Sequence, residues 1–180
     1  MPSPPHTYKI IGVGNEFRSD DAVGIFIARK LVEKIVAHVQ VMECSGEGTA
    51  LMDAWSGAEF VLLIDAVQTG NPVGTIFRLN ALSDSLPKKF FNYSSHAFGV
   101  AEAIALAREL KTLPQQLFIY GIEGRTFNFG TEMSPEVKAS AEVVIDEIIR
   151  MREMSSLEQQ RSEDSEITTH KNKSLISSDD

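Results

Sequence analysis

Residues 8–36 read YKIIGVGNEFRSDDAVGIFIARKLVEKIV. The first seven, from Tyr8 to Gly14, are an apolar run that ends in glycines, which predicts a buried strand. Residues 22–36 then place apolar side chains four positions apart, from Val23 to Ile35, as an amphipathic helix does. A buried strand that leads into a helix is the first half of a βαβ unit, so this stretch predicts a mostly parallel sheet.

Strand and helix patterns continue to alternate after residue 36. We predict further strands at 38–44, 60–66, 74–79 and 117–121, and helices at 49–55, 97–110 and from the Ser134-Pro135-Glu136 cap to about residue 154. The strand at 60–66 is the most apolar and is expected in the centre of the sheet. The strand at 74–79 follows Gly70-Asn71-Pro72 directly and is expected at an antiparallel edge. The predicted fold class is α/β, a twisted sheet with helices on both faces.

Composition limits the function classes. The 180 residues carry 17 Lys and Arg against 25 Asp and Glu, a net charge of −8, which argues against binding to nucleic acid or to an anionic membrane surface. No apolar run approaches the roughly 20 residues that cross a bilayer, and the N-terminus has no secretory pattern. With one cysteine, Cys44, the chain forms no internal disulfide. We expect a cytoplasmic protein without membrane insertion, monomeric when free.

The composition changes at residue 155. Residues 155–180 contain seven Ser, six acids and three bases but no aromatic residue, Gly or Pro. Such a segment buries too little apolar surface to offset the entropy of ordering it. We therefore predict one domain at 1–154 and a disordered, acidic, Ser-rich tail at 155–180.

Polar residues follow several of the predicted strands, where α/β proteins place their ligands. They are Asp20 and Asp21 after the first strand, the Ser45–Thr49 loop after the second, Asp65 at the end of the third, His96 before the helix at 97–110, and Glu123 after the last strand. Each has a purely structural alternative: loop amides could satisfy Asp65, the two adjacent acids could cap a helix, and His96 could be exposed. Together, two carboxylates and an imidazole make a three-ligand metal site with room for water.

Other catalytic signatures are missing. There is no HExxH helix and no GxSxG elbow. Gly12-Val13-Gly14 begins like a dinucleotide-binding fingerprint but lacks the third glycine. A nucleotide-handling enzyme would bind phosphate at Asn15 to Arg18, where Glu16 and the two following acids would repel it.

Several motifs in combination resemble the [NiFe]-hydrogenase maturation endopeptidases. Gly12-Val-Gly-Asn15 followed by Ser19-Asp-Asp-Ala-Val-Gly24 is similar to the GxGNxxxxDDGxG opening of that family. The remaining matches are Gly48-Thr49, Leu63-Ile-Asp65-Ala66, Ser95-His96, Tyr120-Gly-Ile-Glu-Gly124 and Met133-Ser-Pro-Glu136. The resemblance covers about residues 8–150. It departs from the family at Ala22, where a Gly is commoner, and in the Ser45-Gly-Glu-Gly-Thr loop, where many members have Asp-Gly-Gly-Thr.

The resemblance implies a three-layer αβα sandwich around a five-stranded sheet, as in phosphorylase/hydrolase-like folds. It also implies an endopeptidase that removes the C-terminal extension of the hydrogenase large-subunit precursor after nickel insertion. The family's metal-binding positions fall on Asp21, Asp65 and His96, with Asp20 as the fallback for the first. Nickel would be supplied by the substrate, although the same ligands suit other divalent metals such as zinc.

The resemblance also suggests substrate contacts, and the proposed chemistry needs a general base. Glu47, Gly48, Thr49 and Glu123 are expected to bind the substrate, and Asp20 or Glu123 is the candidate general base. The partner would be the nickel-loaded precursor. A non-catalytic, nickel-sensing partner of that precursor is the main alternative, and the nucleotide-handling enzyme is a second one.

Overall fold

The structure is a computed structural model that describes residues 7–34, 39–83, 99–130 and 132–154. It divides into a compact unit of residues 1–145 and a second unit of residues 146–180, each considered by itself. The described part of the second unit is the end of the last helix, which runs over 135–154. The predicted tail at 155–180 lies outside the described residues. No helix in the described ranges is long and apolar enough to span a lipid bilayer.

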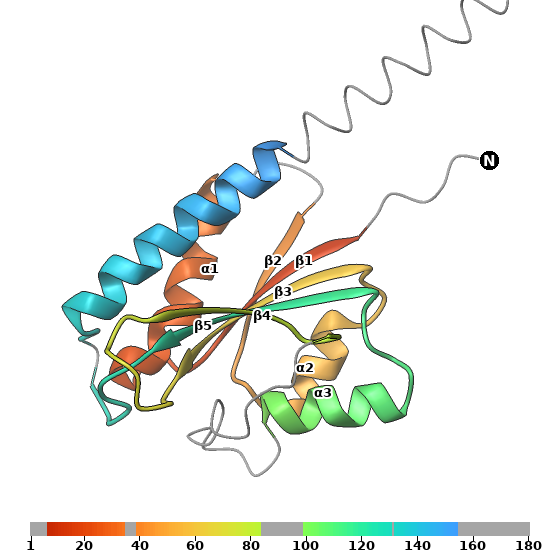
Figure 1. The fold of residues 1–180 in the computed structure, drawn as a ribbon, viewed down its shortest axis with the longest axis horizontal. Helices are drawn as coiled ribbons and strands as arrows, with labels where there is room; N and C mark the ends of the chain where they lie inside the picture. The colour runs from red at the N-terminus through yellow and green to blue at the C-terminus, as the bar shows by residue number, and fades with distance from the viewer. Residues whose placement is uncertain (1–6, 35–38, 84–98, 131, 155–180) are drawn as a thin grey trace, which may run out of the picture. The chain divides into compact units, whose positions relative to one another are not determined.

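A five-stranded sheet forms the centre of the first unit (Figure 1). Its strands are β1 (Tyr8–Val13), β2 (Val39–Cys44), β3 (Phe60–Val67), β4 (Ile76–Asn80) and β5 (Gln116–Glu123), in the order β2-β1-β3-β5-β4. All neighbours are parallel except β4, which runs antiparallel to β5 at the edge. The central position of β3 and the antiparallel edge strand were both predicted from sequence and are confirmed.

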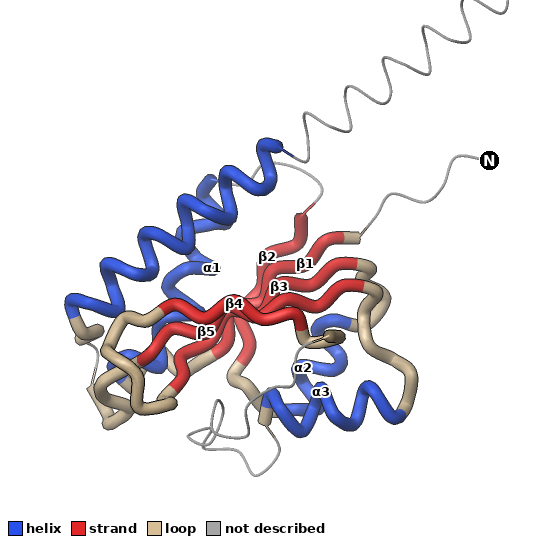
Figure 2. The backbone as a smooth tube through the Cα atoms, in the orientation of Figure 1, coloured by secondary structure: helices blue, strands red, loops and turns tan. Residues whose placement is uncertain are grey.

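Helices cover both faces of this sheet (Figure 2). The α1 helix (Val23–Lys34) packs on one face over β1, β2 and β3. On the other face lie α2 (Gly48–Trp55) and α3 (Val100–Glu109), which contact each other. The predicted α/β fold with a mostly parallel five-stranded sheet between helical layers is confirmed.

Strand alternation divides the core between the two faces. Two alternate residues of each of β1, β3 and β5 join a cluster with α2 and α3, of which the fully buried Trp55 is the largest side chain. This cluster includes Val61 and Leu63 of β3. Their neighbours Leu62 and Ile64 are equally buried but lie on the α1 face by alternation. The β3 strand is therefore buried on both faces, as its continuous apolar run predicts.

Two differences from the sequence-based boundaries affect the site. The helix predicted to begin at residue 22 begins at Val23 as α1, and a separate 3-10 turn, η1 (Ser19–Ala22), precedes it. The last strand continues two residues beyond the predicted end at Gly121, because Ile122 and Glu123 pair with Ala66 and Val67 of β3. Glu123 thus ends a strand and does not belong to the following loop.

Because three glycines have no side chain, the backbones of η1 and α1 come into direct contact with the backbone of the sheet. A Cβ atom on Gly24 would lie 2.2 Å from the Val13 carbonyl oxygen and 2.3 Å from that of Ile64. A Cβ on Gly12 would meet the Gly24 carbonyl oxygen at 2.2 Å, and one on Gly14 would meet the Asp21 carbonyl oxygen at 1.8 Å. These glycines account for the Gly12-Val13-Gly14 motif by packing, without a phosphate ligand.

Gly24→Ala is expected to destabilise the protein by about 1–3 kcal/mol, because the new methyl group forces α1 away from β1 and β3. The free energy of unfolding in urea measures this effect. Val32→Ala is the control, since Val32 lies on the exposed side of the same helix and its loss should change stability by less than about 0.5 kcal/mol. A Gly24→Ala protein as stable as the wild type would contradict the close packing.

Candidate active site at the carboxyl edge of the sheet

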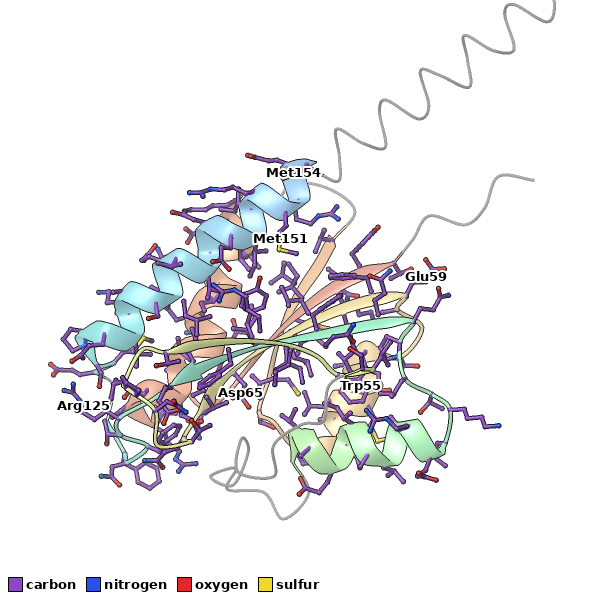
Figure 3. All side chains as sticks on the ribbon, in the orientation of Figure 1. Trp55, Glu59, Asp65, Arg125, Met151 and Met154 are labelled. Carbon is purple, nitrogen blue, oxygen red and sulfur yellow. The ribbon has the colours of Figure 1, made fainter. Side chains whose placement is uncertain are left out.

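The carboxyl ends of β1, β2, β3 and β5 meet at one edge of the sheet, because these strands are parallel. The η1 turn follows β1 at this edge, α2 follows β2, and the loop after β5 begins at Gly124. Figure 3 labels Asp65, near the end of β3, and Arg125, in the loop after β5. Most of the predicted site residues therefore gather where open α/β sheets bind ligands.

Asp65 is a carboxyl group buried at the end of an apolar strand. Only 9% of the residue is exposed, and it pairs in register with Gly121 of β5. Burial and, to a smaller extent, the negative charge of Asp21 raise the pKa of Asp65 from 3.8 to about 8, although a hydrogen bond from the Ala66 backbone opposes part of this rise. At neutral pH Asp65 therefore holds a proton in the metal-free protein.

Asp21 is the acid of η1 that faces Asp65. The η1 turn contacts β3, and the charge of Asp21 is felt at the Asp65 carboxyl. On its other side, Arg18 Nη1 lies 3.8 Å from Asp21 Oδ2. The structure thus brings together two of the three predicted metal ligands, and it does so with Asp21 rather than with Asp20.

The chemistry of this carboxylate pair fits a divalent cation. Two carboxyl groups in a shared, partly dry site cannot both ionise cheaply, and a cation between them would remove that conflict. Among the residues that the structure describes, no three His, Cys, Asp or Glu side chains form a metal-sized group. The third predicted ligand, His96, lies in 84–98, outside the described residues, so the three-ligand set stays a prediction.

Asp20, the candidate general base, has a different environment. It is fully buried, and its carboxylate accepts hydrogen bonds from the backbone N–H groups of Arg125, Thr126 and Ser134 and from the Ser134 hydroxyl. A general base needs an oxygen within reach of the water that it activates. Because both oxygens of Asp20 are engaged, this geometry favours a structural part, and the general-base role stays a prediction.

Glu123 is the second buried carboxylate that organises a loop. It is 2% exposed and accepts hydrogen bonds from the backbone N–H groups of Thr69 and Gly70 and from the Thr69 hydroxyl. These bonds fix the loop that leaves β3, two to three residues beyond the strand end at Val67. Its roles as a substrate-binding residue or as a base stay predictions.

The predicted substrate-binding loop after β2 forms the start of α2. Glu47 is the N-cap of this helix, and its carboxylate accepts hydrogen bonds from the Thr49 and Ala50 backbone N–H groups and from the Thr49 hydroxyl. Gly48 is the first residue of the helix. An acidic side chain in this position stabilises the helix, because it accepts hydrogen bonds from the free N–H groups and its charge interacts favourably with the helix dipole. Substrate contacts of Glu47, Gly48 and Thr49 stay predictions.

Sequence reasoning missed the partners that hold the loops of this edge. Arg29 of α1 bonds Glu16 at 2.9 Å and Glu43 of β2 at 2.9 and 3.0 Å, so it ties the loop after β1 to β2. The hydrogen bond and charge of Arg29 lower the pKa of Glu16. Glu16 therefore stays negatively charged in the loop where a nucleotide phosphate would have to bind.

Asp65→Asn is expected to change how stability depends on pH. The unfolded chain releases the Asp65 proton near pH 3.8 and the folded protein near pH 8. Between these values folding takes up a proton, so the free energy of unfolding falls by about 1.4 kcal/mol per pH unit as pH rises. Asn is neutral in both states and removes this fall, which makes the variant more stable than the metal-free wild type at pH 7.

Urea unfolding between pH 5 and pH 8 in the presence of a chelator measures this difference. Asp53→Asn is the control, because it removes a carboxylate from the exposed side of α2. Parallel stability curves for the wild type and Asp65→Asn would contradict the buried, protonated state of Asp65.

The chain is similar to known proteins of one family. The sequence profile described as Hydrogenase maturation protease matches residues 25–151, which is well over half of the chain. The Hydrogenase 2 maturation protease of Escherichia coli strain K12 is 24% identical over 153 residues, covering 83% of this chain and 92% of the relative. The hydrogenase expression/formation protein HupD of Thiocapsa roseopersicina is 26% identical over 163 residues, covering 88% and 73%.

Solved structures show the same fold. The hydrogenase maturating endopeptidase HybD of E. coli superposes with a TM-score of 0.66 at 18% identity, over 82% of this chain and 93% of that one. A [NiFe] hydrogenase maturation protease, HycI, of Thermococcus kodakarensis gives a TM-score of 0.64 at 22% identity, over 80% and 91%. With the profile match over residues 25–151, the chain belongs to the hydrogenase maturation protease family.

Proposed function

We propose that this protease removes the C-terminal extension of the [NiFe]-hydrogenase large-subunit precursor after nickel has been inserted. In this proposal Asp21, Asp65 and His96 engage the nickel that the precursor carries. The observation that carries the proposal is the approach of Asp21 to the buried Asp65 carboxyl, whose pKa is raised to about 8. Nickel belongs to the substrate, and the enzyme supplies the ligands that test for it.

The buried carboxyl pair supports metal engagement because of its electrostatics. A nearby cation favours the ionised form of both carboxyls, so binding it would expel the Asp65 proton. Oxygen and imidazole ligands accept nickel and also zinc, so other divalent metals could occupy the same ligands.

His96 lies in the sequence shortly before a helix that packs on the same face of the sheet as Asp65. By strand alternation, Asp65 lies on the sheet face that carries Leu63 and the helices α2 and α3. Val100, the first residue of α3, is buried in the cluster on that face. His96 precedes Val100 by four residues, which a chain spans in at most about 14 Å.

Peptide hydrolysis at such a site needs a polarised carbonyl and an activated water. A metal held near the scissile bond polarises the carbonyl oxygen or lowers the pKa of a bound water. Asp21 and Asp65 would hold the metal-bearing end of the precursor. Glu47, Gly48 and Thr49 at the start of α2 and Glu123 at the end of β5 lie at the same edge, where they could contact its chain. Asp20 and Glu123 are the carboxylates that the sequence suggests as general base, but both accept hydrogen bonds that fix loops of this edge.

The dependence on substrate nickel would serve as a check on the precursor. Without the metal, Asp65 keeps its proton and the pair has no cation to hold. An unloaded precursor would therefore bind poorly and keep its extension. The free monomeric state and the cytoplasmic location inferred from composition stay predictions.

Asp65→Asn, Asp21→Asn and His96→Ala are each expected to lower cleavage by at least about 100-fold, because each removes one metal ligand. The assay mixes purified protein with the large-subunit precursor of its organism, with and without nickel, and follows intact mass. The wild type should release a C-terminal peptide from the nickel-loaded precursor only.

The matched control is Asp53→Asn, an exposed acid on α2 away from this edge, which should cleave like the wild type. Binding of the nickel-loaded precursor without any mass change would contradict the endopeptidase proposal and leave a nickel-sensing partner. Equal cleavage of the loaded and the unloaded precursor would contradict the proposed dependence on nickel but not the endopeptidase activity.

A further inference from the structure

The turn that carries Asp21 has a strained backbone. Ser19, the first residue of η1, has a φ of 50°, in the left-handed region that non-glycine residues seldom adopt. Such a conformation persists only where the surroundings hold it in place. Here the Ser19 N–H donates to the Gly130 carbonyl at 2.8 Å, and the Gly130 N–H donates to the Phe17 carbonyl at 2.9 Å. The turn is thus paired with the loop that follows β5.

Asp20 supplies the larger part of this attachment. Its Oδ2 accepts from Arg125 N at 2.8 Å, Thr126 N at 3.0 Å and Ser134 Oγ at 2.8 Å, and its Oδ1 accepts from Ser134 N at 2.6 Å. The Asp20 N–H also donates to the Thr126 carbonyl at 3.1 Å. A single buried side chain therefore joins η1 to two points of the chain more than a hundred residues away.

Asp20 and Asp21 are adjacent in one short turn but serve different neighbours. The first is fully buried against the loop after β5, and the second faces Asp65. Because a single peptide unit connects them, the anchoring of Asp20 limits where the Asp21 carboxylate can lie.

We infer that Asp20 is a positioning residue: its hydrogen bonds to residues 125–134 hold Asp21 beside Asp65 at the carboxyl end of β3. This inference rests on the proposed function, because it assigns Asp20 a part in the work of the Asp21–Asp65 pair. A carboxylate suits the position, since all four partners are donors. In Asp20→Asn the side-chain NH₂ must face at least one of them, whichever way the amide is turned.

Ser134 offers a gentler test than Asp20 itself. Ser134→Ala removes one of the four hydrogen bonds and leaves the carboxylate in place. Ser140→Ala is the matched control, because Ser140 lies in the helix that directly follows Ser134 and its hydroxyl donates to the Gly74 carbonyl at 2.6 Å, away from η1. Both variants lose one serine hydrogen bond, so their losses of stability should be similar.

The experiment measures kcat and KM for cleavage of the nickel-loaded precursor, together with unfolding in urea, for the full-length variants. Asp20→Asn should lower kcat by about 10- to 100-fold, as expected for a displacement of about 1 Å at a reacting group. Ser134→Ala should lower kcat by about three- to tenfold, more than it changes KM. Ser134→Thr restores the hydroxyl and should recover most of the rate, while Ser140→Ala should stay within about twofold of the wild type.

Equal loss of rate in Ser134→Ala and Ser140→Ala would overturn the inference, because it would show a general effect of stability. So would an Asp20→Asn protein that cleaves at the wild-type rate. If Asp20→Asn does not fold, the three serine variants decide the question. Asp21→Asn in the same assay distinguishes a failure of the proposed site from a failure of the positioning inference. If Asp21→Asn cleaves normally, the proposed site is wrong. If Asp21→Asn loses activity while the Asp20 and Ser134 variants cleave normally, the positioning inference alone is wrong.

Discussion

The arrangement of this edge of the sheet depends on one unfavourable interaction, the burial of the Asp65 carboxyl beside the charge of Asp21. Burial and this neighbour together raise the pKa of Asp65 to about 8. A fold that only needed stability would replace Asp65 with an apolar or amide side chain, since an ionisable group in an apolar strand costs free energy. Costs of this kind concentrate at functional sites, where a bound ligand offsets them. In the proposed function, the cation that the precursor carries offsets this cost.

Five carboxylates at one edge take different parts because their surroundings differ. Asp20 and Glu123 are buried among backbone N–H donors and hydroxyls, and each fixes a loop. Glu47 caps α2. Asp21 and Asp65 face each other, and the close glycine contacts of η1 and α1 with the sheet keep them within electrostatic reach. Three of these carboxylates therefore stabilise the fold, and the proposed function assigns the other two, Asp21 and Asp65, to the substrate.

The sequence predicts the scaffold well, because its signals are local. The apolar run of β3 and the spacing of α1 fix both elements within a few residues, and the parallel order then brings Asp21 and Asp65 to one edge. The separate parts of Asp20 and Asp21 could not be derived this way. Their difference comes from Arg125, Thr126 and Ser134, more than a hundred residues away, and no local pattern reveals that these donors turn toward Asp20. The resemblance to a family, not spacing, favoured Asp21.

A titration of the isotopically labelled, metal-free protein with Zn²⁺, followed by ¹³C NMR of the side-chain carboxyls at pH 7, tests the central claim most directly. Zinc is diamagnetic and accepts the same oxygen and imidazole ligands as nickel. The account predicts that the signals of Asp21 and Asp65 shift first, that Asp65 loses its proton as they do, and that Asp20 and Glu123 change little. First shifts at other carboxyls, with Asp65 still protonated at saturation, would contradict it.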